Sequence, residues 1–395
     1  MANIRKYFIS LPLIIFMIMR RIVIAFDSFK GSLTSREAGE AFVRGFSEIM
    51  DVDARLVSIA DGGEGMAEAV VESVGGELVT ATVHDPLGRI IEARYAIIDG
   101  GSRAVIAMSA ASGLTLVEAE MRDPAVATTY GVGELILDAY GRGCRDVVVG
   151  LGGSATNDGG VGMLRALGYR FYDAQGAELC ATLDILERVH TISDNEAVAL
   201  DGLSVVAATD VDNPLCGLRG ATHVFGRQKG ADEALVECLE RAMCHYAEVV
   251  DARCGYAASS VPGAGAAGGL GYAMTALLGV PLCSGIDMVL DIVHFDDVVR
   301  GSDLVVTGEG RIDAQTLMGK APAGVLRRAL QWGVPCVAVG GGVAWDALPE
   351  DSGFTAIFSA TPEGMALSEA MRYDVATQNL ISVGRKTALW LLAQE

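Results

Sequence analysis

The segment DVVVGLGGSATNDGGVGMLRAL, Asp146 to Leu167, decides the fold class. A short run of β-branched residues precedes a glycine-rich turn, and an apolar, helix-prone stretch follows it, so we expect a strand, a tight turn and a helix. The turn matches G-x-G-x-x-A, a pattern that lets a backbone approach a phosphate at a helix N-terminus. Read alone, it suggests a nicotinamide-dependent dehydrogenase.

The polar residues of the same turn favour a different ligand. Ser154, Thr156, Asn157 and Asp158 crowd it, and an ionised Asp repels a pyrophosphate unless a cation lies between them. A magnesium-phosphate or hydroxy-acid site fits these side chains better. A structural alternative is that Asn157 or Asp158 merely caps the helix.

Other apolar runs extend the strand prediction along the chain. Each ends in glycine or a carboxylate and is followed by a helical pattern, which is typical of a parallel sheet buried on both faces. The runs are Ile22–Ala25, Leu56–Ala60, Val147–Val149, Val205–Thr209, Leu304–Thr307 and Cys336–Val339. Ligands bind beyond the carboxyl ends of such strands. We therefore expect Asp27, Asp61, Asp210 and Glu309 to gather on one edge.

Residues 76–113 follow a different pattern. Leu78–Val83, Ile90–Ile98 and Ala104–Met108 are closely spaced around turn sequences, which indicates antiparallel hairpins. We interpret 76–284 as an inserted α+β domain, and 19–75 with 285–395 as a discontinuous parallel-sheet domain, with the active site in the cleft between them.

The composition limits the ligands. The chain has 395 residues, 51% of them hydrophobic, and 50 acidic against 30 basic side chains give a net charge of -20. This charge disfavours nucleic acid and anionic membranes, so a small substrate is expected. The eight cysteines show no CxxC pair, which indicates thiols of a reducing cytosol and predicts no zinc site. Residues 1–18 include an apolar run too short for a membrane span, and we interpret them as an extension outside the fold.

Several clusters could carry phosphoryl transfer, which needs magnesium-binding carboxylates, cations for phosphate oxygens and an acid for the acceptor proton. They are Asp27 with Lys30, Asp61 with Glu64, Asp210 with Asn213, Lys229, and the glycine-rich segment Thr307–Asp313 with Glu309, Arg311, Asp313 and Lys320. The structural alternatives are that Glu64 only favours a helix N-terminus and that Arg311 and Asp313 form a surface ion pair.

A second G-x-G-x-x-G pattern lies at Gly263–Gly268. The residues before it do not suggest a strand, which weakens a dinucleotide interpretation. Its backbone amides could hold a phosphate, or its glycines could allow close packing of a helix start. The sequence contains neither a G-x-x-x-x-G-K-[ST] phosphate loop nor a G-x-S-x-G nucleophile motif.

Taken together, these blocks resemble the bacterial class I glycerate kinase (glycerate 2-kinase) family from about Arg21 to the C-terminus. The resemblance is carried by Ile24-Ala-Phe-Asp-Ser-Phe-Lys30, Ala60-Asp-Gly-Gly-Glu-Gly65, Gly150–Gly160, Asp210-Val-Asp-Asn-Pro-Leu215, Phe225-Gly-Arg-Gln-Lys-Gly230, Gly265-Ala-Ala-Gly-Gly269 and Thr307-Gly-Glu-Gly-Arg-Ile-Asp313. Family members commonly have proline where this chain has Phe26 and Arg227. The resemblance implies a Rossmann-like domain with an inserted domain, and Mg²⁺-dependent transfer of phosphate from ATP to D-glycerate, usually on the 2-hydroxyl.

We accordingly predict a role for each group. The catalytic residues are Asp27, Lys30, Asp210, Lys229 and Arg311, with Asp27 or Asp210 as the base; the metal ligands are Glu309 and Asp313. The substrate ligands are Asp61, Glu64, Ser154, Asn157, Asp158 and Asn213; the nucleotide ligands are Gly263, Gly265, Gly268, Gly269 and Lys320. The expected setting is cytoplasmic and compatible with a homodimer. A dehydrogenase and a non-catalytic hydroxy-acid-binding protein are the competing hypotheses.

Overall fold

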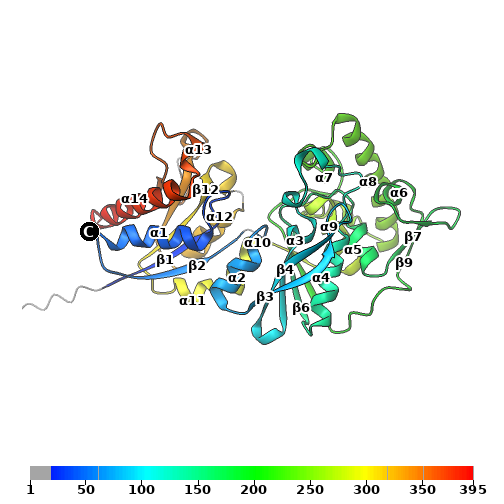
Figure 1. Ribbon diagram of the computed structural model, residues 1–395, viewed down its shortest axis with the longest axis horizontal. Helices are drawn as coiled ribbons and strands as arrows, with labels where there is room; N and C mark the ends of the chain where they lie inside the picture. The colour runs from blue at the N-terminus through cyan, green and yellow to red at the C-terminus, as the bar shows by residue number, and fades with distance from the viewer. Residues whose placement is uncertain (1–18, 61, 318, 350, 395) are drawn as a thin grey trace, which may run out of the picture.

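The computed structural model describes residues 19–60, 62–317, 319–349 and 351–394. The predictions for residues 1–18 and for Asp61 lie outside the described residues. Figure 1 shows two lobes side by side, with the N-terminal strands and the C-terminal helices in one lobe and the middle of the chain in the other. Within the described ranges, none of the helices combines the length and the apolarity that a membrane span needs.

The first lobe contains a fully parallel sheet of five strands in the order β14-β13-β12-β1-β2. The strands are β1 (Arg20–Phe26), β2 (Val52–Ser58), β12 (Leu304–Ile312), β13 (Cys336–Val343) and β14 (Ala356–Ser359). Ile24 of β1 pairs with Leu56 on one side and with Val306 on the other. Because the chain runs from β1 to β2 in one direction and from β12 to β14 in the other, a crevice is expected at the carboxyl ends of β1 and β12.

Helices cover both faces of this sheet. Successive residues of each strand point to opposite faces, and the apolar side chains on both faces are buried. Ile22, Ile24 and Phe26 pack with α1 (Ser35–Ser47) and α14 (Tyr373–Leu392), whereas Val23 and Ala25 face the opposite side. A capping box in which Thr34 and Glu37 bond reciprocally starts α1. The α1 and α14 backbones touch at a glycine, because a Cβ at Gly45 would lie 1.9 Å from the Ile381 carbonyl oxygen.

The second lobe contains a mixed sheet of six strands in the order β11-β10-β6-β5-β4-β3. The strands are β3 (Glu77–His84), β4 (Ile90–Ile98), β5 (Arg103–Ala107), β6 (Asp146–Gly150), β10 (Ser204–Ala208) and β11 (Leu282–Cys283). The predicted hairpins are confirmed, because β3, β4 and β5 pair antiparallel. A small sheet of β7 (Arg170–Tyr172), β8 (Glu178–Leu179) and β9 (Thr191–Ser193) lies apart from it.

The prediction of a single edge for the acids is wrong in part. The α/β class with parallel strands is confirmed, but Asp27 and Glu309 belong to the first sheet, whereas Asp210 follows β10 of the second. Apolar runs of Val and Ile are equally suited to either sheet, so the sequence pattern could not assign them.

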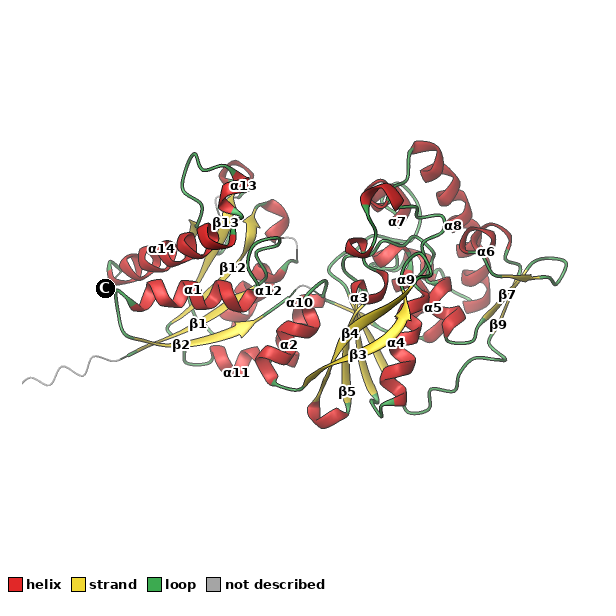
Figure 2. Cartoon of the chain, in the orientation of Figure 1, coloured by secondary structure: helices red, strands yellow, loops and turns green. Residues whose placement is uncertain are grey.

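The remaining helices cover the sheets and join them, as Figure 2 shows. They are α2 (Met66–Val74), α3 (Ser109–Ser112), α4 (Tyr130–Gly141), α5 (Val161–Ala166), α6 (Thr182–Arg188), α7 (Ala221–Phe225), α8 (Glu233–Cys254), α9 (Leu270–Leu278), α10 (Gly285–Ile292), α11 (Phe295–Val299), α12 (Ala321–Gln331) and α13 (Leu367–Ala370). Helices α2 and α10 lie between the two sheets. Their side chains share one hydrophobic core with Val23 and Val305 of the first sheet and Val105 and Val148 of the second.

Candidate active site

A cavity of about 620 Å³ opens at the carboxyl ends of β1, β12 and β13. Its polar side is lined by Asp27, Lys30, Glu309, Arg311, Asp313 and Lys320. Six residues predicted for catalysis, metal or nucleotide binding therefore meet around one space. All of them come from the first lobe, so this cavity is not the predicted cleft between the lobes.

Asp27 directly follows β1 and is 6% exposed. Its backbone N–H donates to the carbonyl of Gly308, in the middle of the neighbouring strand β12, and its Oδ1 accepts from the Ser28 N–H at 2.6 Å. These bonds fix the carboxylate at the cavity wall. Lys30 lies three residues later in the following turn, where it is exposed to solvent.

The segment Thr307–Asp313 is a strand for most of its length, not the flexible glycine loop that we predicted. β12 continues through it, and Arg311 and Ile312 still pair with β13. Glu309, 9% exposed, accepts a hydrogen bond from the buried Thr316 hydroxyl at 2.6 Å. The same hydroxyl accepts from the Asp313 N–H at 3.0 Å. Thr316 thus holds both predicted metal ligands, a role that no sequence pattern indicated.

The cations on this side are more exposed than the acids. Arg311 Nε lies 3.5 Å from Asp313 Oδ2, and the Arg311 side chain is 73% exposed. The ion-pair alternative is therefore confirmed, although an exposed pair of this kind contributes little stability and leaves the guanidinium able to bind a ligand. Lys320 is the N-cap residue of α12 and lies half-buried at the cavity.

The other side of the cavity is apolar. It is lined by Val343, Ala344, Ala360, Met365, Leu367, Ala370, Met371, Ala376 and Leu380, with Asn379 among them. Most of these residues come from α13, α14 and the chain just before them. Sequence reasoning missed this wall because apolar residues at helical spacing are the ordinary signature of a core-facing helix.

A smaller cavity of about 320 Å³ lies at the end of β10 and is lined by Thr209, Asp210, Val211, Asp212, Pro262, Leu282, Cys283, Ser284 and Gly319. Asp210 Oδ1 accepts hydrogen bonds from the Gly285 N–H at 2.8 Å, the Ser284 hydroxyl at 3.1 Å and the Ile286 N–H at 3.4 Å. Asp210 therefore anchors the start of α10. Gly319 belongs to the first lobe and comes close to the Asp210 backbone, so the smaller cavity, which Gly319 lines, lies beside the larger one, which Lys320 lines.

The Gly150–Gly160 turn is confirmed as a strand-to-helix connection between β6 and α5. Its first glycines contact Gly62 and Gly63, because a Cβ at Gly150 would lie 2.1 Å from the Gly62 carbonyl oxygen and one at Gly152 would lie 2.7 Å from the Gly63 Cα. Asp158 is fully buried, and its carboxylate accepts from Gly160 N–H, Gly162 N–H and the Thr129 backbone and hydroxyl. Burial raises the pKa of Asp158 against these bonds. The capping alternative therefore accounts for this residue.

Lys229, predicted to be catalytic, is 2% exposed inside the second lobe. Its Nζ donates to the Thr156 carbonyl at 2.6 Å and to the Ser154 hydroxyl at 2.9 Å. Burial lowers its pKa to about 7, with Asp158 acting in the opposite direction. Asn157 is also fully buried and donates to the Thr222 hydroxyl. None of Ser154, Asn157, Asp158 and Lys229 lines either cavity described above.

The Gly263–Gly269 glycines sit where three loops meet. A Cβ at Gly268 would lie 2.0 Å from the Thr156 carbonyl oxygen, and one at Gly265 would lie 2.3 Å from that of Pro214. Close packing, the structural alternative for this segment, therefore explains the glycines. Asn213 accepts from the Gly265 N–H through its carbonyl and donates to Arg219 O at 2.8 Å. Glu64 is exposed on the turn before α2.

The fold and the site define an α/β protein with a small-molecule site at the carboxyl edge of its parallel sheet. The chain belongs to the glycerate kinase family, whose model matches residues 22–392. It is 43% identical over 380 residues to a glycerate kinase of Bacillus cereus, covering 95% of this chain and 99% of the relative.

Two further relatives agree. A glycerate 2-kinase of Escherichia coli is 43% identical over 363 residues, which cover 90% of this chain and 94% of the relative. A crystal structure assigned to glycerate kinase 2 of Salmonella typhimurium superposes with a TM-score of 0.83 at 39% identity, covering 95% of this chain and 99% of that one.

Proposed function

We propose that this protein transfers the γ-phosphoryl group of ATP to the 2-hydroxyl of D-glycerate, giving 2-phosphoglycerate and ADP. Membership of the glycerate kinase family supports the reaction, and the Escherichia coli relative named glycerate 2-kinase supports the choice of hydroxyl. The observation that carries the proposal is the two-sided cavity of the first lobe, apolar on one wall and charged on the other.

The lining of this cavity supports one orientation of ATP. The wall formed by Met365, Leu367 and Met371 suits the purine, and the Asn379 amide could bind its polar edge. The phosphates would then lie toward Arg311 and Lys320, whose charges offset theirs. This placement replaces the Gly263–Gly269 segment as the proposed nucleotide site, while Lys320 keeps its predicted role.

The charged wall of the cavity suits a hard divalent cation. Glu309 and Asp313 present carboxylate oxygens, the ligands that Mg²⁺ prefers, beside the proposed phosphate position. When bound, Mg²⁺ neutralises charge that develops on the transferring phosphate. The Thr316 hydroxyl fixes the Glu309 side chain, so this carboxylate needs little reorganisation to take part.

Asp27 is the better candidate for the general base. In the reaction the glycerate 2-oxygen forms a bond to the γ-phosphorus, the bond from that phosphorus to the β-bridging oxygen breaks, and the hydroxyl proton passes to a carboxylate. Asp27 lines the cavity. Asp210 lines the smaller cavity instead, where three donors at the start of α10 hold its Oδ1.

Glycerate would lie between the proposed phosphates and the smaller cavity, since Lys320 lines the larger cavity and Gly319 the smaller. Lys30 and Glu64 are the exposed side chains that we retain for its recognition. We also retain the proposed domain boundaries, because the first sheet draws its strands from 20–58 and 304–359, and the second from 77–283. A cytoplasmic location and a homodimer stay predictions.

A coupled assay tests the reaction. Full-length protein is incubated with D-glycerate, Mg²⁺ and ATP, and ADP release is followed, with L-glycerate and omission of ATP as controls. Adding enolase then reports 2-phosphoglycerate directly. ADP release whose product enolase does not consume would refute the regiochemistry, and NAD⁺ reduction without ADP release would refute the kinase.

The nucleotide position has its own test. Leu367→Asp places a carboxylate in the apolar wall at a position that is 74% exposed, so folding should tolerate it. We expect a higher KM for ATP and an unchanged KM for glycerate. Leu389→Asp, on the same apolar residue type, 55% exposed and outside the cavity lining, is the matched control. Equal effects of the two substitutions would contradict this placement.

A further inference from the structure

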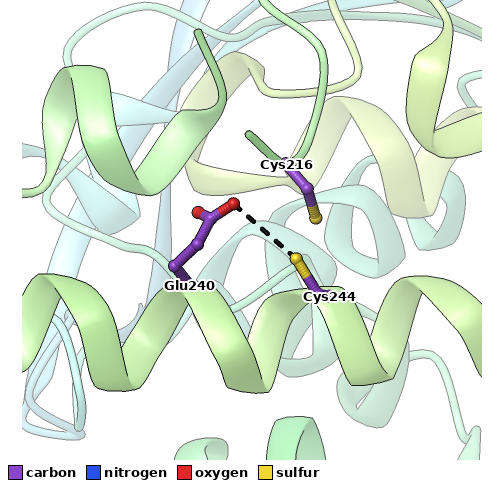
Figure 3. A group of neighbouring side chains, drawn as sticks. All are labelled: Cys216, Glu240 and Cys244. Carbon is purple, nitrogen blue, oxygen red and sulfur yellow. Dashed lines mark hydrogen bonds between the residues drawn. The ribbon is translucent and has the colours of Figure 1, made fainter. Parts of the chain in front are cut away.

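A cluster of two thiols and a carboxylate lies in the second lobe, away from the proposed active site. Cys216 follows the loop after β10, and Glu240 and Cys244 lie one turn apart on α8. Figure 3 shows the three side chains converging, with Cys244 bonded to Glu240. One ligand atom from each residue lies within 4.8 Å of the other two. Neither cavity described above includes them.

The spacing of these atoms suits tetrahedral coordination. The Cys244 Sγ lies 3.7 Å from Glu240 Oε1, and Zn–S and Zn–O bonds of about 2.3 and 2.1 Å place neighbouring ligands roughly 3.6 Å apart. Two sulfurs and one carboxylate form a soft donor set that selects Zn²⁺ over Mg²⁺. Three protein ligands leave a fourth position for water.

The Glu240 carboxylate provides an independent observation. Glu240 is 8% exposed, and within the described part of the chain its Oε2 makes no hydrogen bond although it is buried. His223 Nδ1 lies 3.4 Å from this oxygen, without hydrogen-bond geometry. A buried carboxylate oxygen without a hydrogen bond lowers the stability of the fold. Coordination of the carboxylate, with His223 turned to donate to it, would satisfy both groups, as is usual behind a metal ligand.

We propose that Cys216, Glu240 and Cys244 form a binding site for a soft divalent cation of the Zn²⁺ class, with His223 positioning Glu240. Binding forms two metal–sulfur bonds and releases the two thiol protons to solvent. The cation would join α8 to the loop that follows β10, reinforcing the hydrogen bond of 2.5 Å from the Gly217 N–H to Glu240 Oε1.

Releasing the two thiol protons costs free energy, because the surroundings raise the pKa of both cysteines. Burial raises the pKa of Cys216, and proximity to Cys244 and Glu240 raises it further. Burial likewise raises the pKa of Cys244. Because a thiol must lose its proton to bind a metal, metal binding should weaken as the pH falls.

Cobalt titration of the reduced, chelator-treated full chain tests the site. We expect one Co²⁺ per chain, an intense near-ultraviolet thiolate-to-cobalt band, and displacement by Zn²⁺ but not by Mg²⁺. Cys216→Ser and Cys244→Ser should each weaken this band and lower affinity. Cys238→Ser, on the same helix but outside the cluster, should retain both band and affinity.

Glu240→Gln keeps both thiols and guards against a folding artefact. It should retain the band and lower metal affinity, because it removes the charge of one ligand, with an unchanged circular dichroism spectrum. Absence of the band in the wild-type protein, or an equal loss in Cys238→Ser, would overturn the proposal. Because the readout is metal binding, failure here and failure of the proposed kinase activity are separate results.

Discussion

Replacing Asp27 or Asp210 by asparagine separates the two candidates for the general base. Each substitution removes one negative charge and hardly changes the shape of the side chain. The asparagine Oδ1 can still accept from the Ser28 N–H at residue 27, and from the α10 donors at residue 210. At residue 210 the N-cap of α10 is unaffected, because that position is held by Ser284. Both variants should therefore fold.

Catalysis should respond only to the first change. Loss of a general base lowers kcat by about 10²- to 10⁴-fold, which corresponds to about 2.7–5.4 kcal/mol of transition-state stabilisation. We expect this loss for Asp27→Asn, with little change in either KM. Asp210→Asn should stay within a few-fold of the wild type, because the acceptor that Asp210 provides survives.

The assay is steady-state ADP release at saturating ATP, D-glycerate and Mg²⁺, with thermal unfolding measured on the same samples. Asp210→Ala is the structural control. It removes the acceptor of the Gly285 N–H bond and should cost about 1–3 kcal/mol of stability, because the donor loses its partner. A 100-fold loss of kcat in Asp210→Asn beside near-normal Asp27→Asn would refute the assignment of Asp27 as the base.

Three further predictions follow from individual contacts. Glu309→Gln should raise the Mg²⁺ concentration needed for half-maximal activity by at least tenfold, because it removes a carboxylate ligand while Thr316 can still donate to the amide oxygen; an unchanged Mg²⁺ titration would remove Glu309 from the metal site. Gly268→Ala should sharply destabilise the second lobe, measured by urea unfolding, because its Cβ would lie 2.0 Å from the Thr156 carbonyl at a φ of +67°; stability near that of the wild type would contradict this packing. The pKa of Lys229 is about 7 in the folded protein instead of 10.5, so the unfolded chain binds the proton more tightly. The free energy of unfolding should therefore rise between pH 7 and pH 10.5. Lys229→Met should lose this rise, and equal pH profiles for both proteins would count against a buried, perturbed lysine.

Much of the framework could be predicted from the sequence. Apolar runs such as Ile22–Ala25 and Cys336–Val339 became strands where they were expected, because Val and Ile runs between helices have few alternatives in an α/β protein. The sheet to which each run belongs was not predictable. Pairing of β10 with β6, and of β1 with β12, is decided by contacts between residues more than fifty positions apart.

The charged residues of the candidate site were predicted from the sequence, but its apolar wall was not. Asp27 and Glu309 were identified because they follow apolar runs predicted as strands, and Lys320 because it is a cation shortly after the glycine-rich segment Thr307–Asp313. The apolar wall from α13 and α14 carries no distinctive pattern. Lys229 shows the opposite problem, since a lysine in a glycine loop resembles a phosphate ligand in sequence, whereas its 2% exposure depends on packing from distant segments.

The core between the lobes limits how the two cavities can approach each other. Buried side chains of α2 and α10 pack against both sheets in one continuous hydrophobic cluster. Opening the lobes as rigid bodies would expose that apolar surface, at roughly 25 cal/mol for each Å². Movement should therefore concentrate in short segments that bridge the lobes. Gly319 and Lys320 lie in such a segment, since one lines the smaller cavity and the other the larger. Phosphate and acceptor would then meet beside Gly319 and Lys320, where the two lobes come close, without rotation of whole lobes.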